Sequence, residues 1–260
     1  MLSNTNRGAY ALVIAGSSSD SGAGIQMDLK TFHSFGIYAT SVITCLTAQN
    51  TTGVKNVELT KIFEEQLLAV LSDIEISVVK FGVVPDKEYF KIFKKHCNYL
   101  KYVLDPVMVA EADSFSFVKE KEALIEMAKN KNCLISTPNL IEAERLSGIK
   151  INDLSSGIEA VNKLKRLGLK SFIIKGVKYS ENQICDIFFN QNLDEPRLFI
   201  KKKLPYKFHG SGCCFASLIT ANYYISNSLY NSIVLAEDYI EKVLNRAEKI
   251  GKGEVLVAMP

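Results

Sequence analysis

Short runs of β-branched and other apolar residues alternate along this chain with longer runs in which apolar residues recur every three or four positions. The short runs predict buried strands at 10–15, 38–46, 78–81, 102–104, 133–136 and 171–175. The longer runs predict helices at 25–35, 63–74, 87–96, 139–146, 158–167, 213–226 and 230–250. Two further runs, at 184–189 and 198–202, look like an antiparallel pair of strands.

Alternation of strands and helices is typical of an α/β fold, in which a mostly parallel sheet carries helices on both faces. In such sheets ligands bind beyond the carboxyl ends of the strands. The polar residues of this chain gather after the predicted strands, at 16–24, Gln49 and Asn50, Asp105, Asn139 and Glu142, Lys175, and 210–214. We therefore expect a binding site at this edge of the sheet.

The composition favours one large globular domain over residues 1–260. Of the 260 residues, 47% are hydrophobic, which is enough for a sizeable core, and no Pro/Ser-rich linker divides the chain. The net charge is +3 and the lysines are scattered, with no basic stripe between aromatic residues, so we expect no nucleic-acid partner. The one tight basic cluster, at 201–203, is expected to be a solvated strand end.

No segment reaches the roughly 18 apolar residues of a membrane span, and residues 1–9 are too polar for a signal peptide. The six cysteines form no C-x-x-C pair, so a zinc knuckle is unsupported, and three of them, Cys45, Cys133 and Cys185, lie in apolar strand-like runs. These features predict a protein of the reducing cytoplasm with no membrane partner.

The most informative stretch is Gly210-Ser211-Gly212-Cys213, which opens into an apolar helical run. Two glycines allow a ligand to approach the backbone, and the helix start offers unpaired N–H groups at the positive end of its dipole. This is a candidate anion site. A cysteine in such a first turn is expected to have a lowered pKa, so Cys213 is a candidate base.

The loop 16–24 between the first strand and the first helix is rich in glycine and serine. It matches neither the Walker pattern nor the dinucleotide fingerprint, so it is either a tight turn or a ligand loop of another kind. Asp28 follows Gly24 by one helical turn. It could face the same cleft, or it could simply interact with the helix dipole.

The other polar residues at the strand ends also allow two interpretations. Gln49 could pair with a heteroaromatic amine or lie in a polar loop. Asp105, Asn139 and Glu142 suit a Mg²⁺ ion that bridges phosphates, but Asp105 could be a turn residue and Glu142 a dipole partner. Lys175 could neutralise a phosphate or be an exposed strand-end lysine.

A cysteine–histidine hydrolase is the least favoured reading of the same residues. His209 precedes Cys213 by only four residues, across a glycine loop, and no orienting Asn or Asp is evident in the sequence. The neighbouring Cys214 is interpreted as a packing residue of the helix.

Taken in order, five motifs resemble the hydroxymethylpyrimidine/phosphomethylpyrimidine kinases of thiamine biosynthesis, which are ribokinase-like enzymes. The motifs are AG-x5-GAGIQ-x-DLKT at 15–31, SVIT-x-L-x-AQNT at 41–51, LDPVMVA at 104–110, TPNL-x-EA at 137–143 and HGSGC at 209–213. The resemblance implies a three-layer α/β/α fold with a mostly parallel sheet of about eight strands, and a homodimer. It also implies phosphorylation by ATP of the pyrimidine's hydroxymethyl group, and then of the monophosphate.

The resemblance assigns roles to individual residues. It makes Cys213 the base beside the acceptor hydroxyl, and Gly210, Ser211 and Gly212 the anion hole, with Lys175 at the phosphates. Gln49 would bind the aminopyrimidine in a pocket completed by Gly16, Ala23, Asp28 and Val107. The cofactors implied are ATP and Mg²⁺, with the metal and its waters organised by Asp105, Asn139 and Glu142.

The chain departs from the family pattern in four places. In the first loop, Ser18, Ser19 and Ser21 replace an Asp-x pair and a glycine, and Asp20 comes two positions late. The other departures are Val177-Lys178 after the strand-end lysine, Glu111-Ala112-Asp113 after the Asp-Pro motif, and Val83 in place of a methionine. They put phosphate and product contacts in question.

Two other functions remain possible from the sequence. One is a pyridoxal or pyridoxine kinase of the same fold, which Gln49 disfavours because an amide pairs well with an amine and a ring nitrogen. The other is a non-catalytic relative that binds a pyrimidine or nucleotide, which the altered first loop suggests and the intact GSGC and Asn-x-x-Glu motifs disfavour.

Overall fold

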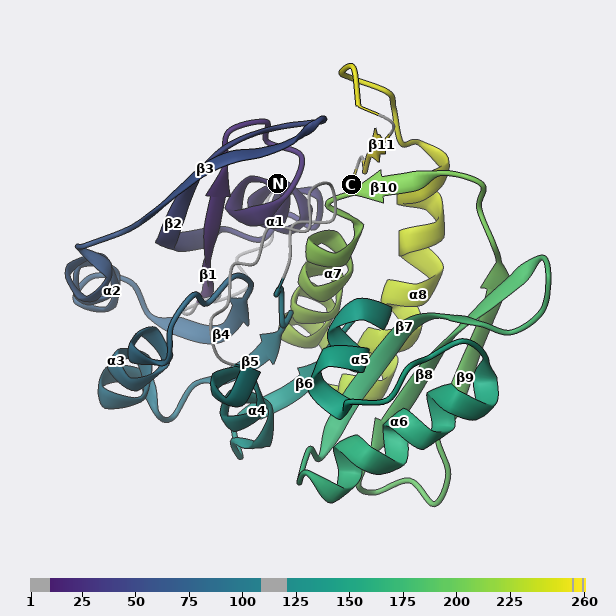
Figure 1. Cartoon of the computed structure of the whole chain (residues 1–260). Coiled ribbons are helices and arrows are strands. Elements are labelled where there is room, and N and C mark those ends of the chain that lie inside the picture. Colours follow the sequence, from purple (N-terminus) through teal and green to yellow (C-terminus); the bar gives the residue numbers. More distant parts are fainter. Residues whose placement is uncertain (1–9, 109–120, 254, 259) are drawn as a thin grey trace, which may run out of the picture.

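The computed structural model describes residues 10–108, 121–253, 255–258 and 260. Within these residues the main sheet has nine strands in the order β3-β2-β1-β4-β5-β6-β7-β8-β9 (Figure 1). The strands are β1 (Tyr10–Ser18), β2 (Ala39–Asn50), β3 (Gly53–Leu59), β4 (Ile76–Phe81), β5 (Lys101–Leu104), β6 (Cys133–Ser136), β7 (Ser171–Lys178), β8 (Gln183–Asn190) and β9 (Arg197–Lys202).

The middle of the sheet is parallel and its edges are antiparallel. The six strands from β2 to β7 in the spatial order pair in parallel, so their carboxyl ends meet along one edge. β3 pairs antiparallel with β2, and β7, β8 and β9 pair antiparallel in sequence. The predicted mostly parallel sheet and the predicted antiparallel pair are both confirmed.

Helices cover both faces of the sheet and complete the three layers. The helices are α1 (Gly24–Ser34), α2 (Phe63–Leu71), α3 (Lys87–Cys97), α4 (Lys121–Lys129), α5 (Leu140–Ser147), α6 (Leu154–Arg166), α7 (Ser211–Ser226) and α8 (Leu229–Asn245). Side chains of α2 to α6 join one apolar cluster with the sheet, whereas those of α1, α7 and α8 join clusters on the other face. Burial on both faces explains why the central strands are continuously apolar.

A second, two-stranded sheet lies beside the main one. β10 (Lys207–His209) pairs in parallel with β11 (Val255–Val257), and β10 leads through Gly210 directly into α7 (Figure 1). The sequence predicted a loop here. Three-residue strands whose partners lie almost fifty positions apart leave no local pattern, so this sheet could not be read from the chain.

Three other elements, β3, α4 and α8, also differ from the prediction. The sequence missed β3 because most of its side chains are partly or fully exposed, and its pairing extends β2 as far as Asn50. It also missed α4, and α8 ends at Asn245 rather than at 250. The predictions for 1–9 and for Glu111-Ala112-Asp113 lie outside the described residues. In the described part of the chain, no helix is both long and apolar enough for a membrane crossing.

Candidate active site

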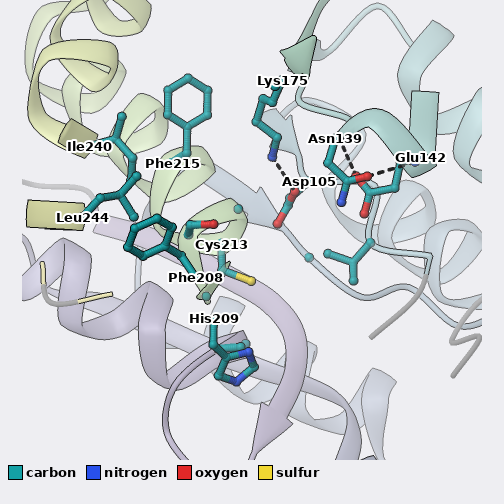
Figure 2. A pocket seen from close by; sticks show the side chains of 18 of the residues that line it. Asp105, Asn139, Glu142, Lys175, Phe208, His209, Cys213, Phe215, Ile240 and Leu244 are labelled. Carbon is teal, nitrogen blue, oxygen red and sulfur yellow. Dashed lines mark hydrogen bonds and ion pairs between the residues drawn. The ribbon is translucent and has the colours of Figure 1, made fainter. Parts of the chain in front are cut away.

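A cavity of about 580 Å³ lies at the carboxyl edge of the parallel strands. All predicted site residues except Asp28 line it: Gly16, Ala23, Gln49, Asp105, Val107, Asn139, Glu142, Lys175, Gly210, Ser211, Gly212 and Cys213. Figure 2 shows Cys213 between the charged side chains from the strand ends and a group of apolar side chains. The cavity thus has a charged part, an apolar part and a helix start between them.

The start of α7 is held in place by the first loop. Gly210 has a φ of 78°, the left-handed region, and a Cβ atom there would collide with the carbonyl of Gly22. The first intrahelical bond runs from Cys214 N–H to Gly210 O, at 2.9 Å. The N–H groups of Ser211, Gly212 and Cys213 precede it and have no acceptor within the helix, so the helix start faces the cavity with donors.

The pKa predicted for Cys213 is wrong for the free protein. Burial raises the pKa of this thiol above its usual value, and the charges of Asp105 and Asp28 raise it further. Lys80 and the Gly24 N–H act in the opposite direction but do not compensate. The helix-dipole argument failed because it left out desolvation, and Cys213 is therefore a neutral thiol near pH 7 until a ligand changes its surroundings.

Asp28 lies behind the cavity wall, contrary to the predicted substrate contact. Its side chain is fully buried and forms an ion pair of 2.8 Å with Lys80 of β4, and it accepts a 2.8 Å hydrogen bond from Ser217 of α7. Burial raises the pKa of Asp28, and Lys80 opposes that effect. The first helix, β4 and α7 are thereby joined through one buried carboxylate.

Lys80 is a residue that the sequence reasoning missed. Its side chain has no exposed surface, and its ammonium group lies 2.8 Å from Asp28 and 3.8 Å from Asp105. The signal was present as one lysine inside the apolar strand Ile76–Phe81. A fully buried lysine is rare without a carboxylate partner, so it could have been flagged, although its partners could not have been named.

Asp105 lies between two lysines at the end of β5. Lys80 Nζ is 3.8 Å from its Oδ2 atom and Lys175 Nζ is 3.6 Å from its Oδ1 atom. The carboxyl group also accepts a hydrogen bond of 3.4 Å from Thr137. Among the described residues, no hydrogen-bond donor reaches the buried Oδ2 atom. This acceptor can still bind a water or a cation.

Asn139 and Glu142 form a capping box at the start of α5. Asn139 Oδ1 accepts from the Glu142 N–H at 2.9 Å, and Glu142 Oε2 accepts from the Asn139 N–H at 2.8 Å. The interpretation of Glu142 as a residue that stabilises a helix start is therefore correct. The side chains of Asn139 and Glu142 also line the cavity, so this role does not exclude ligand binding. Within the described chain, no three His, Cys, Asp or Glu side chains gather as a metal site.

The altered first loop makes its own hydrogen-bond network. The Asp20 carboxylate accepts from Ser18 Oγ at 2.6 Å and from the Gly22 N–H at 3.0 Å, and its other oxygen lies 3.1 Å from His209 Nε2. The same His209 nitrogen lies 3.2 Å from Nε2 of Gln49. Burial alone would raise the pKa of Asp20, but the hydrogen bonds from His209, Ser18 and Gly22 outweigh it and lower its pKa to about 2.

The apolar part of the cavity comes from the last elements of the chain. Figure 2 shows Phe208, Phe215, Ile240 and Leu244 together on one side of Cys213. The sequence reasoning assigned no residues to this part, because the side chains come from a short strand and two helices that no local pattern connects.

The prediction that 201–203 is a solvated strand end holds for Lys202 and Lys203, which are exposed, but not for Lys201, which is half-buried. All three lysines line the cavity, and Lys201 forms ion pairs of 2.8 Å with Asp186 and 2.6 Å with Glu237. Burial is the main cause that raises the pKa of Glu237 to about 8, and Asp186 adds to it while Lys201 opposes it. These two ion pairs explain why Lys201 is half-buried although β9 is an edge strand with mostly exposed side chains.

The three-layer fold, the helix start at the strand edge and the charged cavity define a ribokinase-like kinase. The family model described as phosphomethylpyrimidine kinase matches residues 18–258. The chain belongs to this family.

Two curated relatives support the same assignment. The thiamine biosynthesis bifunctional protein of Geobacter sulfurreducens is 36% identical over 93% of this chain, which spans about half (50%) of that protein's length. The hydroxymethylpyrimidine/phosphomethylpyrimidine kinase of Haemophilus influenzae is 34% identical, with 93% of both chains covered.

Solved structures of similar fold include two kinds of kinase. An ADP complex of Bacillus subtilis pyridoxal kinase superposes with a TM-score of 0.82 at 28% identity, covering 96% of each chain. A phosphomethylpyrimidine kinase from Clostridium difficile has a TM-score of 0.74 at 34% identity, covering 91% of this chain and 99% of its own. The structural likeness therefore includes both sister activities, whereas the family model names one.

Proposed function

We propose that this chain uses ATP to phosphorylate 4-amino-5-hydroxymethyl-2-methylpyrimidine, and then phosphorylates the monophosphate to the diphosphate, in thiamine biosynthesis. The observation that carries the proposal is the cavity, which brings Gln49, Cys213, the α7 start and Asp105 together in a chain of the phosphomethylpyrimidine kinase family. An amide for the ring, a thiol for the hydroxyl and a helix start for the phosphates are what the transfer needs.

The phosphoryl group would transfer at the start of α7. The hydroxymethyl oxygen would lie beside Cys213, and the N–H groups of Ser211 and Gly212 would bind the transferring oxygens. A loose transition state needs little deprotonation of the alcohol, so a late proton transfer is sufficient. Cys213 would accept that proton only as a thiolate, after bound ligands have offset the burial that raises its pKa. Most of the acceleration would come from positioning and from charge neutralisation by Lys175.

ATP would occupy the charged and the apolar parts of the cavity together. Solved kinases of similar fold were determined with ADP and with an ATP analogue, which supports nucleotide binding here. We propose that the phosphates lie near Lys175 and the base against Ile240 and Leu244. Both contacts follow from the chemistry of the lining, charged at one end and apolar at the other.

Mg²⁺ fits the residues present at the strand ends. The buried Asp105 oxygen that lacks a donor is a ready ligand for a metal-bound water, and Glu142 lines the same cavity. Two carboxylates, waters and substrate phosphates are a usual environment for this ion. When bound, Mg²⁺ would neutralise phosphate charge, while Asp105 and Asn139 would orient its waters.

A pyridoxal kinase is the second candidate, because the solved structures of similar fold include pyridoxal kinases. Gln49 favours the aminopyrimidine, since its amide offers one acceptor and one donor to an amine and a ring nitrogen. The absence of product from either ring would favour the non-catalytic binding role.

Three further expectations remain proposals. We propose a single kinase domain over 1–260, a location in the cytoplasm and a homodimer. The β2–β3 edge exposes Leu46, Leu59 and the adjoining Ile62, an apolar group of the kind found at subunit interfaces. Light scattering coupled to gel filtration would distinguish a dimer from a monomer.

The deciding experiment is an ATP/Mg²⁺ end-point assay that separates mono- and diphosphate products, run in parallel with the pyrimidine and with pyridoxal. Diphosphate from the pyrimidine is the expected result. Monophosphate alone would place the defect in phosphate accommodation near Ser18 to Ser21 and Val177-Lys178. Pyridoxal phosphate alone would overturn the proposal in favour of the second candidate.

A further inference from the structure

The departure in the first loop gives this chain a three-membered contact at the recognition amide. Asp20 Oδ2 lies 3.1 Å from His209 Nε2, and the same nitrogen lies 3.2 Å from one end of the Gln49 amide. The other end of the amide is 3.3 Å from Thr47 Oγ1. Asp20 and His209 are almost buried, with side chains 9% and 11% exposed. Water therefore screens these contacts only in part.

The carboxylate decides which form of His209 is present. A bare Nε2 would place its lone pair 3.1 Å from a charged oxygen that has no aligned hydrogen-bond donor, whereas a proton on Nε2 is attracted to that oxygen as in an ion pair. Because the pKa of Asp20 is held near 2 by its hydrogen bonds, the carboxylate is charged at neutral pH. The negative charge favours a proton on Nε2, in the Nε2–H tautomer or in the imidazolium, and because that N–H is not aligned with Asp20 it is available to Gln49.

A donor at His209 in turn decides the orientation of the Gln49 amide. The end that faces Nε2–H has to be the carbonyl oxygen, and the NH₂ group then faces Thr47 Oγ1, which can accept. Each end keeps one further hydrogen-bonding position for a ligand. The cavity therefore presents an acceptor and a donor in a fixed order.

We infer that Asp20, acting through His209, is a specificity-determining positioning residue that holds the Gln49 amide in the orientation required by an aminopyrimidine. The inference rests on the proposed function. The ring's exocyclic amine donates and its neighbouring ring nitrogen accepts. A 4-oxo analogue carries the reverse order, a carbonyl beside a ring N–H. Since the hydroxymethyl group has to face Cys213, the ring cannot turn over to exchange the two.

Asp20→Asn is the test, because it keeps the shape of the side chain and replaces the acceptor that faces His209 with a donor. The asparagine oxygen can still accept from Ser18 Oγ and Gly22 N–H, and its NH₂ group meets His209 Nε2 in place of a carboxylate. His209 then has to be bare at Nε2, and the Gln49 amide is free to turn its NH₂ end towards it.

The measurement is kcat/KM for the aminopyrimidine and for the 4-oxo analogue, in wild type and variant. We expect wild type to prefer the amino substrate, and the variant to lose roughly tenfold or more of that preference. The loss should come through KM, with kcat for the amino substrate nearly constant, which a merely structural role would not produce. Ser19→Ala is the matched control: its hydroxyl contacts only the Gln49 backbone, so both substrates should weaken alike.

Each outcome has one meaning. An unchanged preference in Asp20→Asn overturns the inference and leaves the proposed function intact. Equal use of both rings by wild type also overturns it. If wild type phosphorylates neither ring, the proposed function fails and the inference fails with it.

If Asp20→Asn does not fold, ¹⁵N NMR of wild type tests the inference by showing whether Nε2 of His209 carries a proton. His209 is one of three histidines and can be assigned by its loss in His209→Asn. A protonated Nε2 is expected, and a bare Nε2 would overturn the inference.

Discussion

Two walls of the cavity are held in different ways. The first-loop wall, formed by residues 16–24 with Gln49 and His209, is a network of short hydrogen bonds with one carboxylate, Asp20. The strand-end wall, formed by Asp105, Asn139, Glu142 and Lys175, contains a capping box and a carboxylate between lysines. The first wall is suited to recognising the hydrogen-bonding groups of a heteroaromatic ring, and the second to binding phosphates and a metal ion.

The two walls also tolerate sequence change differently. In the first-loop wall an aspartate stands two positions later than in the family pattern, and it still reaches Ser18 and His209. A loop can move a carboxylate along the chain and recover a partner, because its backbone N–H groups are available at many positions. In the strand-end wall each position is fixed by a strand or by the start of α5, so the residue type has to stay in place.

The buried Lys80 supports both walls, because it binds Asp28 beneath one and Asp105 in the other. Lys80→Met would leave Asp28 as an uncompensated buried charge. We expect a loss of about 3–5 kcal/mol of unfolding free energy, measured by urea denaturation. This is the largest effect that we predict, since it disturbs both walls.

Two further variants test the cause. Lys80→Met with Asp28→Asn removes both charges and should recover much of the lost stability. Lys91→Met breaks an exposed pair with Glu88 and should leave the free energy of unfolding nearly unchanged. A cost for Lys80→Met no greater than that of Lys91→Met would mean that the buried pair contributes nothing.

Cys213 lies between the two walls, and its substitution should affect the chemistry more than either binding step. We expect Cys213→Ala to lower kcat by roughly 10²-fold or more with little change in KM for the pyrimidine. Because the pKa of the thiol is raised, its alkylation near pH 7 should also be slow in the free protein. Cys214→Ala is the matched control for kcat, because it removes a buried thiol that accepts a hydrogen bond from Thr31 and does not line the cavity. Turnover like that of wild type would remove Cys213 from the mechanism.

Gln49→Ala should act on the first-loop wall alone. We expect KM for the pyrimidine to rise roughly tenfold or more, because ligand groups that lose water would lack a partner. KM for ATP should stay close to the wild-type value, since the nucleotide is proposed to bind the strand-end wall. Steady-state kinetics with each substrate varied in turn measures both. A rise in the ATP value of the same size would mean that the walls are not independent.

The contrast between the walls also explains what could be predicted from the sequence. Asp105 follows β5 and Lys175 lies in the carboxyl half of β7, and parallel strands of an α/β sheet bring these ends to one edge, so their meeting was predictable. Lys80 and Asp28 could not be paired in advance, because their contact depends on how α1 and α7 pack over the sheet. The Asp20–His209 contact could not be predicted either, because it requires β10, whose partner β11 lies at the far end of the chain.

The smallest predicted effect separates charge from shape in the first-loop wall. Hydrogen bonds lower the pKa of Asp20 from 3.8 to about 2, so its stabilising contribution is complete above the unfolded value, near pH 4, and is lost as the pH falls towards 2. Thermal melts of wild type and Asp20→Asn between pH 2 and 6 should therefore differ most at the upper end, by on the order of 1 kcal/mol after allowance for partial solvent screening, and converge towards pH 2. A difference that stays constant over this range would mean that the carboxylate holds the loop by shape and neutral hydrogen bonds. In that case charge would control only the strand-end wall, and the two walls would differ more than the ion pair with His209 implies.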